Sequence, residues 1–228
     1  MTKYARVRQN RRRDIVDLKT LQKTDPVKPQ AEITMDEGLS PMSPPEQYEA
    51  ALPDQFAKDD FHPFLKELMK DHEMLQGELS KFDLTLESIK KDGAITSENH
   101  KNFEVFFNFF EEIFIPHNRQ EEQILFPKLR KRLVESGEHS KGPTPTTGVD
   151  VLEAEHTEAI QLFGMILNCF TLYPQILEKQ SRQVILTDMI GLGKKLIELM
   201  ELHIFREDKI IFCLAQKLLP SSELSNLS

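Results

Sequence analysis

Two pairs of histidine and glutamate share a spacing that suits metal binding. His117 is followed four residues later by Glu121, and His203 is followed at the same spacing by Glu207. Residues four apart on a helix lie one above the other on the same face, so the imidazole and the carboxylate of each pair can reach one ion. A carboxylate that points into a protein core is costly unless it is paired, and a bound cation removes that cost. Each pair is therefore a candidate half of a metal centre.

Two further histidines, His72 and His156, extend the candidate site. A single histidine in an apolar stretch is more often a core residue than a ligand, and only the repeated pairs favour a metal. Four neutral imidazoles and two carboxylates divide between two ions, with two histidines on each ion and both glutamates bridging. This ligand set suits iron or manganese. If coordination positions on the metal stay open to solvent or a small ligand, the set suits non-haem iron in particular. The predicted ligands are His72, His117, Glu121, His156, His203 and Glu207.

Four amphipathic helices must position these residues, because apolar residues recur at steps of three and four along four long segments. The first stripe comprises Leu65, Leu68, His72, Leu75, Leu79, Phe82, Leu86 and Ile89. The second comprises Phe103, Phe107, Phe110, Phe114, His117, Glu121 and Ile124. The third comprises Leu152, His156, Ala159, Phe163, Ile166 and Phe170. The fourth comprises Met189, Leu192, Leu196, Leu199, His203, Glu207, Ile210 and Leu214.

The lengths of the connections bring the four histidines to one level of a bundle. The midpoint between His72 and His117 falls within the turn at residues 92–97, and the midpoint between His156 and His203 falls near the break after Pro174. We therefore predict an all-α protein, an up-down-up-down four-helix bundle. One mismatch lies at the loop of residues 137–148, because His117 precedes it by about 19 residues whereas His156 follows it by only about 8. At the helical rise of about 1.5 Å per residue, the end of the second helix or the loop must absorb this difference of roughly 16 Å.

The N-terminal part of the chain differs from the predicted bundle in composition. Residues 1–13 contain six lysines or arginines and no acidic residue, and residues 24–53 are rich in proline with little apolar periodicity. Such a segment cannot bury enough apolar surface to order itself. We interpret residues 1–58 as a basic and then proline-rich disordered tail, and residues 59–220 as the bundle. A contact of the tail with an anionic membrane or a nucleic acid, or a targeting role, stays open.

Composition narrows the functional classes. The net charge of -8 argues against nucleic-acid binding by the folded domain, because phosphate contacts need a basic face. No run approaches the roughly 18 apolar residues of a membrane span, and no signal peptide opens the sequence. Cys169 and Cys213 form no CxxC motif, so neither a disulfide framework nor a cysteine zinc site is expected. These features predict a soluble cytoplasmic protein without a membrane span.

Short motifs surround the predicted ligands over about residues 60–219. They are Asp71-His72, His117-Asn-Arg-Gln-Glu121-Glu122, Glu155-His156 and His203-Ile-Phe-Arg-Glu207-Asp208. In this order the motifs resemble the hemerythrin-like cation-binding (HHE) family. The resemblance implies an up-down-up-down bundle that holds two non-haem iron ions bridged by carboxylates.

The same resemblance bears on the reaction of the iron with small ligands. Oxygen-carrying hemerythrins have a fifth histidine one turn after the ligand of the third helix, and here that place is Ile160. Four histidines with two bridging glutamates look more like the iron-sulfur cluster repair branch, whose proteins respond to nitric oxide and oxidative stress. That branch often carries an N-terminal domain with a cysteine, and residues 1–58 contain none.

Three functional classes remain. The first is a di-iron protein that binds or reacts with oxygen or nitric oxide, or that supplies iron to an acceptor protein for cluster repair. One alternative within this class is a protein that binds or senses oxygen reversibly. The second is a di-iron oxidase or peroxidase-like enzyme, and the third is a metal-free helical interaction module. A ferritin-like site is disfavoured, because Glu153/His156 is the only Glu-x-x-His pair among the stripes.

The choice between Glu207 and Asp208 depends on helical phase. Glu207 continues the steps of three and four from His203 to Ile210, whereas Asp208 lies about 100° further round the helix. We therefore predict that Glu207 is the bridging residue. Asp208, and likewise Glu122 after Glu121, are expected to face solvent.

Overall fold

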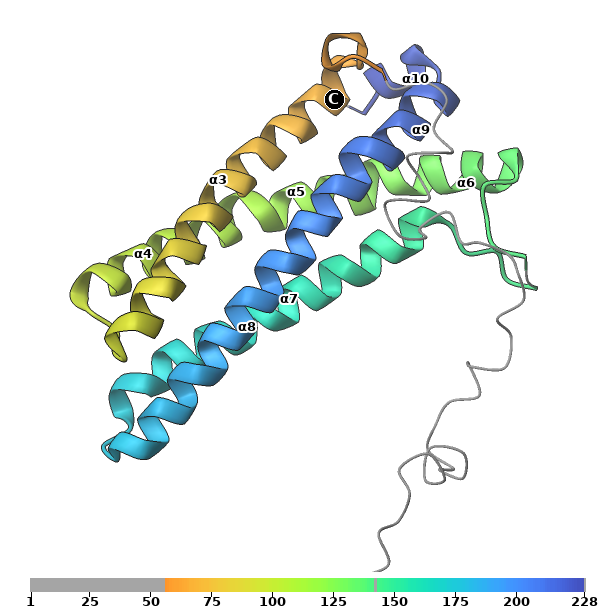
Figure 1. The fold of residues 1–228 in the computed structure, drawn as a ribbon. Coiled ribbons are helices and arrows are strands. Elements are labelled where there is room, and N and C mark those ends of the chain that lie inside the picture. Colours follow the sequence, from red (N-terminus) through yellow and green to blue (C-terminus); the bar gives the residue numbers. More distant parts are fainter. Residues whose placement is uncertain (1–55, 142, 228) are drawn as a thin grey trace, which may run out of the picture. The chain divides into compact units, whose positions relative to one another are not determined.

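The computed structural model describes residues 56–141 and 143–227, and this part of the chain is helical and contains no strand. Four long helical runs follow one another in antiparallel order (Figure 1). The predicted all-α, up-down-up-down four-helix bundle is thereby confirmed. The predicted basic and proline-rich tail falls, up to residue 55, outside the described residues.

The first run is α3 (Pro63–Asp92), which follows a short 3-10 turn, η2 (Lys58–Asp60). Proline suits the first helical position, where the missing N–H has no partner within the helix. The run ends at Gly93, whose φ of 65° is a left-handed conformation that glycine adopts without steric cost. Every residue of the predicted first stripe is buried, so this helix was predicted correctly.

The second run, residues 97–136, consists of three α-helices joined by two π-helical turns. In order these are α4 (Ser97–Phe109), η3 (Phe110–Phe114), α5 (Ile115–Gln120), η4 (Glu121–Leu125) and α6 (Phe126–Ser136). The Thr96 hydroxyl accepts a hydrogen bond from the backbone N–H of Asn99 and caps the start of the run. A π turn adds one residue to a helical turn, so it changes which side chains face the core after it.

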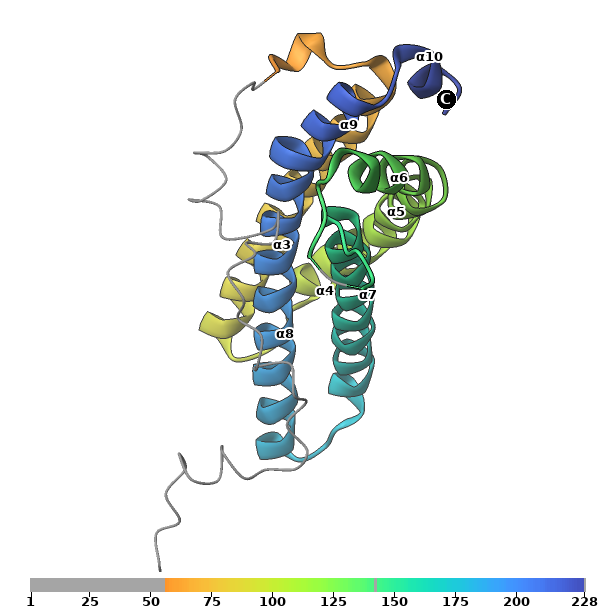
Figure 2. The ribbon, with the colours of Figure 1, turned by 90° about the vertical axis from the view of Figure 1, so that its right-hand side faces the viewer.

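The third and fourth runs form the second antiparallel pair and pack along each other (Figure 2). The third run is α7 (Gly148–Leu172), and the 3-10 turn η5 (Tyr173–Gln175) follows it. The fourth run, residues 179–218, comprises α8 (Lys179–Arg206), the π turn η6 (Glu207–Ile211) and α9 (Phe212–Leu218). The short helix α10 (Ser221–Ser225) ends the described part of the chain.

Apolar side chains fill the bundle on both sides of one polar layer. One buried cluster includes Leu68, Leu125, Phe126, Leu152, Ile210 and Phe212. The other includes Leu75, Phe110, Phe114, Ala159, Met200 and Ile204. Along each run the predicted histidine lies between residues of the two clusters. The polar layer is therefore enclosed by apolar packing above and below.

Helices α3 and α8 approach closely at Gly193. A Cβ atom at this position would lie 2.6 Å from Cδ1 of Leu86, which is closer than packed carbon atoms allow. The predicted fourth stripe placed Leu192 and Leu199 in the core, but both are half-buried, and Gly193 and Met200 are buried instead. Leu192 and Leu199 are seven residues apart and lie along one edge of the true buried face, so the apolar spacing alone did not show which side of α8 packs against α3.

The connection between the second and third runs takes up the predicted length mismatch. The second run continues to Ser136 and its last helix, α6, packs against α9 and α7. A hydrogen bond of 2.8 Å from the backbone N–H of Ser140 to the carbonyl of Thr146 closes the loop that follows. None of the helices in residues 56–141 and 143–227 is long and apolar enough to cross a membrane.

Candidate metal centre

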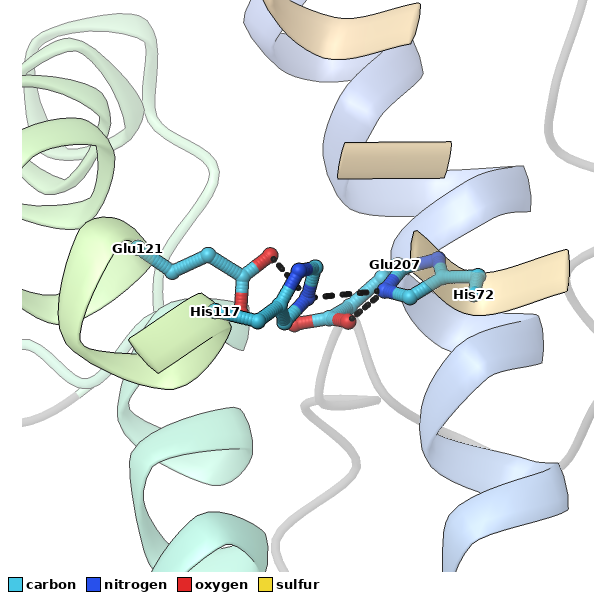
Figure 3. Close-up of side chains that lie close together, drawn as sticks. All are labelled: His72, His117, Glu121 and Glu207. Carbon is cyan, nitrogen blue, oxygen red and sulfur yellow. Dashed lines mark hydrogen bonds and ion pairs between the residues drawn. The ribbon is translucent and has the colours of Figure 1, made fainter. Parts of the chain in front are cut away.

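Four imidazoles and two carboxylates meet in the polar layer. The imidazoles come from α3, α5, α7 and α8, one from each run, and the carboxylates belong to the first residues of η4 and η6. None of the six side chains is more than 5% exposed. In Figure 3, His72 and Glu207 lie opposite His117 and Glu121 and point toward them. The structure thus brings together all six residues that the sequence singles out as ligands.

The donor atoms form two groups that share both glutamates. The Nε2 atoms of His72 and His117 are 3.1 Å apart, and those of His156 and His203 are also 3.1 Å apart. Within each group, one atom from each histidine and one from each glutamate lie within 4.8 Å of one another. We call the group with His72 and His117 the first subsite, and the group with His156 and His203 the second subsite.

The two shared carboxylates are buried without hydrogen bonds. Glu121 and Glu207 are both 0% exposed, and none of their four oxygens accepts a hydrogen bond of good geometry from the described residues. Imidazole nitrogens approach to 3.0 Å from Glu207 and 3.5 Å from Glu121. Burying a carboxylate in this state is costly, and cations between the two groups would satisfy all four oxygens. The donor set therefore fits a pair of bound cations.

The histidines of the first subsite bind protons strongly in the metal-free protein. Burial opposes protonation of His72, but its hydrogen bond to Asp208 and the nearby carboxylate of Glu207 raise its pKa to about 9. Burial also opposes protonation of His117, and the charge of Glu121 raises its pKa well above the usual value. A metal ion must displace these protons to bind at the first subsite.

The second subsite and the shared glutamates behave differently. Burial and the charge of His203 lower the pKa of His156 to about 3, so this imidazole is neutral and ready to bind a metal. Burial and the charge of Glu207 raise the pKa of Glu121. Burial also acts to raise the pKa of Glu207, but the charge of the nearby His203 holds that pKa well below its usual value.

Each shared glutamate begins a π-helical turn. Glu121 opens η4 and Glu207 opens η6. Such turns occur frequently at functional sites. Beyond each turn the buried face moves by about one residue, because Leu125 is buried where the stripe predicted Ile124, and the predicted Leu214 is only half-buried. The second predicted stripe is therefore correct up to Glu121 and wrong at Ile124, whereas in the fourth stripe Ile210 is buried as predicted and Leu214 is not.

A second layer of four carboxylates surrounds the imidazoles, and each accepts a hydrogen bond from one Nδ1–H. The bonds are His72 to Asp208 at 2.8 Å, His117 to Asp71 at 3.2 Å, His156 to Glu122 at 2.8 Å and His203 to Glu155 at 3.0 Å. Each carboxylate binds a histidine of a neighbouring run, so the four bonds form a closed ring around the bundle. An ionised carboxylate can only accept, which places the proton on Nδ1 and leaves Nε2 able to bind a metal.

The ring corrects the prediction for Glu122 and Asp208. They are 40% and 25% exposed, respectively, but each holds an imidazole of a neighbouring run rather than only facing solvent. Asp71 and Glu155, which precede His72 and His156, were not predicted to contact the site either. The available signal was an acidic residue next to one predicted ligand on each of the four runs.

Residues 64–215 match the family model described as the hemerythrin HHE cation binding domain. The chain belongs to the hemerythrin HHE cation-binding domain family. Among curated proteins, none matches the chain. The hemerythrin domain and the buried histidine and glutamate groups together indicate metal binding.

Other residues considered for the hemerythrin site lie outside its layer. Glu153 is 33% exposed and forms an ion pair of 2.5 Å with Arg130, so it does not make a ferritin-like pair with His156. Ile160 is 45% exposed on α7 and supplies no donor. The two donor groups found in the described part of the chain therefore contain four histidines.

Proposed function

We propose that this hemerythrin domain holds two iron ions, bridged by Glu121 and Glu207, and that it binds or reacts with oxygen or nitric oxide. The single observation that carries the proposal is the pair of buried carboxylates without hydrogen bonds, shared between two groups of histidines. A metal-free interaction module would gain nothing from this costly arrangement. Nitrogen and oxygen donors without a thiolate favour iron over softer metals.

Local charge supports two ions rather than one. Six carboxylates lie in the layer and its ring, and Arg206 pairs with one of them, Glu155. With all six ionised, five negative charges remain, which one divalent ion reduces to three and two divalent ions reduce to one. Burying charge is costly, so the second ion is favoured.

The surroundings of the first subsite support binding of a small ligand. A pocket of about 10 Å³, the size of one water molecule, touches His72 and His117. Its other walls are mainly apolar, with Leu75, Phe109 and Ile113 among them. Bound ferrous ions would supply electrons and open coordination positions for a diatomic ligand. The protein's part is to aim the four Nε2 atoms inward and to exclude bulk water.

We further propose that the domain gives up iron to an acceptor, as cluster repair under stress would require. Support comes from the missing fifth imidazole, because a site with fewer protein ligands releases its metal more easily. Ile160 is exposed where oxygen carriers have that histidine. Reversible oxygen carriage is therefore the less favoured function.

The test begins with iron content and the absorption spectrum. The full chain, loaded with Fe²⁺ without oxygen, should hold about two iron ions and should react with oxygen or nitric oxide without a long-lived oxygen adduct. A chain that retains no iron would refute the proposal. A stable and reversible oxygen complex would reassign the function to oxygen binding, and repeated turnover of peroxide would reassign it to an oxidase or peroxidase.

A further inference from the structure

The described part of the chain contains two similar halves that meet at the polar layer. The first half is α3 with the second run, and the second half is α7 with the fourth run. Each half supplies an acid-His dipeptide followed by a His-x3-Glu-acid-x3-Phe segment. These are Asp71-His72 with residues 117–126, and Glu155-His156 with residues 203–212.

The contacts repeat along with the sequence. The ring of Phe212 stacks on His72 with centroids 5.5 Å apart, and Phe126 stacks on His156 at 5.9 Å. In each half, the acid of the dipeptide binds the second histidine of its own half, and the acid after the shared glutamate binds the first histidine of the other half. The two subsites are therefore related by an approximate two-fold, and departures from it show how they differ.

The clearest departure is Arg206. It lies immediately before η6, and the equivalent residue immediately before η4 is Gln120. Arg206 Nη1 pairs with one oxygen of Glu155, whose other oxygen accepts the hydrogen bond from His203. Asp71, the counterpart of Glu155, forms no ion pair with lysine or arginine among the described residues. The side chain of Glu155 is 9% exposed, and that of Asp71 is 27% exposed.

We propose that Arg206 is a positioning residue that makes the second subsite the tightly bound one and leaves the first subsite exchangeable. The inference rests on the proposed function, namely that both subsites bind iron. Glu155 is held at both oxygens, so it cannot turn away, and Nε2 of His203 stays aimed at the metal. Partners of this kind are known to control metal affinity, because they fix the orientation of the ligand they contact.

Solvent access favours exchange of the metal at the first subsite. The pocket of about 10 Å³ touches His72 and His117, and a second pocket of about 160 Å³ is lined by Asp208, which holds His72. At the second subsite, the carboxylate that holds His156 is Glu122, which is 40% exposed and therefore does not shield this subsite from solvent. The tighter hold at the second subsite therefore depends on Glu155 and Arg206.

The test measures release of iron from the full chain. The protein is loaded with two equivalents of Fe²⁺ without oxygen and mixed with an excess of a chelator that becomes coloured on binding Fe²⁺. The natural sequence should release iron in two phases of equal amplitude, and His72→Ala should remove the fast phase. Arg206→Gln, which copies the first half, should speed the slow phase by about 10-fold to 100-fold and leave the fast phase unchanged.

The reciprocal variant Gln120→Arg is the matched control. It introduces a guanidinium at the equivalent place beside Asp71 and should slow the fast phase. A general loss of stability would speed both phases and could not produce this gain. An unchanged fast phase in Gln120→Arg would overturn the inference even if Arg206→Gln failed to fold.

Two further outcomes separate this inference from the proposed function. Release of two iron ions in a single phase, at the same rate in the natural sequence and in Arg206→Gln, would overturn the role of Arg206 alone. A chain that binds no iron would overturn both.

Discussion

Replacing Glu121 by glutamine should stabilise the metal-free protein while it weakens iron binding. The Glu121 carboxylate is fully buried without a hydrogen bond and lies in the same layer as Glu207, which is also acidic. An unsatisfied buried polar group costs about 1–3 kcal/mol, and more when charged. Imidazoles of His117 and His156, 3.5 Å away, offset part of the cost. We therefore expect Glu121→Gln to gain about 2 kcal/mol, or about 4–8 °C in melting temperature for a domain of this size.

The gain should depend on pH in a defined direction. Burial and the charge of Glu207 raise the pKa of Glu121. A group whose pKa is raised by folding stabilises the folded state below its ordinary pKa, and this stabilisation is lost as pH rises through the raised value. Glutamine does not titrate, so the advantage of the variant should grow as pH rises from the ordinary pKa of glutamate to the raised value and should be complete above it.

Urea unfolding at pH 8 with a chelator measures the effect, and Glu112→Gln, an exposed change on the same run, is the control. Iron at 100 times its Kd should stabilise the natural sequence by about 2.7 kcal/mol, which reverses the order of the two proteins. If Glu121→Gln is no more stable than the natural sequence without metal, the carboxylate has a partner and the argument for a bridging role fails.

Three further predictions concern the acidic residues 207 and 208, the pH dependence of stability, and two glycines of α8. Glu207→Gln should lower the iron content sharply, whereas Asp208→Asn should cost about 10-fold or less in affinity, because an amide oxygen still accepts from Nδ1 of His72. In the metal-free protein, His72 should account for a loss of about 3 kcal/mol of stability as pH rises from 6.5 to 9, because its pKa is raised to about 9 and each unit is worth about 1.4 kcal/mol. Gly193→Ala should destabilise by about 1–3 kcal/mol because of the contact with Leu86, whereas Gly191→Ala, with open space around its Cβ, should stabilise by up to about 1 kcal/mol.

Each of these expectations has a simple check. Iron analysis after dialysis would contradict the first if both acidic variants lost the same amount. Urea unfolding across pH would contradict the second if His72→Gln kept the full pH dependence. Thermal unfolding would contradict the third if the two glycine variants changed in the same direction by the same amount.

Helical periodicity predicted the fold because it records which face of each helix is buried. It succeeded fully for α3, where every residue of the stripe is in the core. It failed at Ile124 and Leu214, because the π turns η4 and η6 each contain a residue that a period of 3.6 does not include. Pro127 follows η4 closely, but no proline follows η6 within α9, so the sequence offered no common signal for the two turns.

The six inner side chains could be predicted because their spacing follows the geometry of single helices and equal loop distances, although their role as ligands stays a prediction. The surrounding ring could not, because each of its bonds joins two different runs. Asp71 is next to His72 in sequence but binds His117, and Asp208 is the residue that binds His72. Which imidazole a given acid reaches depends on how neighbouring helices are rotated about their axes. This rotation is set only when the helices pack against one another. The difference between Arg206 and Gln120 is visible in the sequence, but it acquires meaning only once the approximate two-fold makes the two positions equivalent.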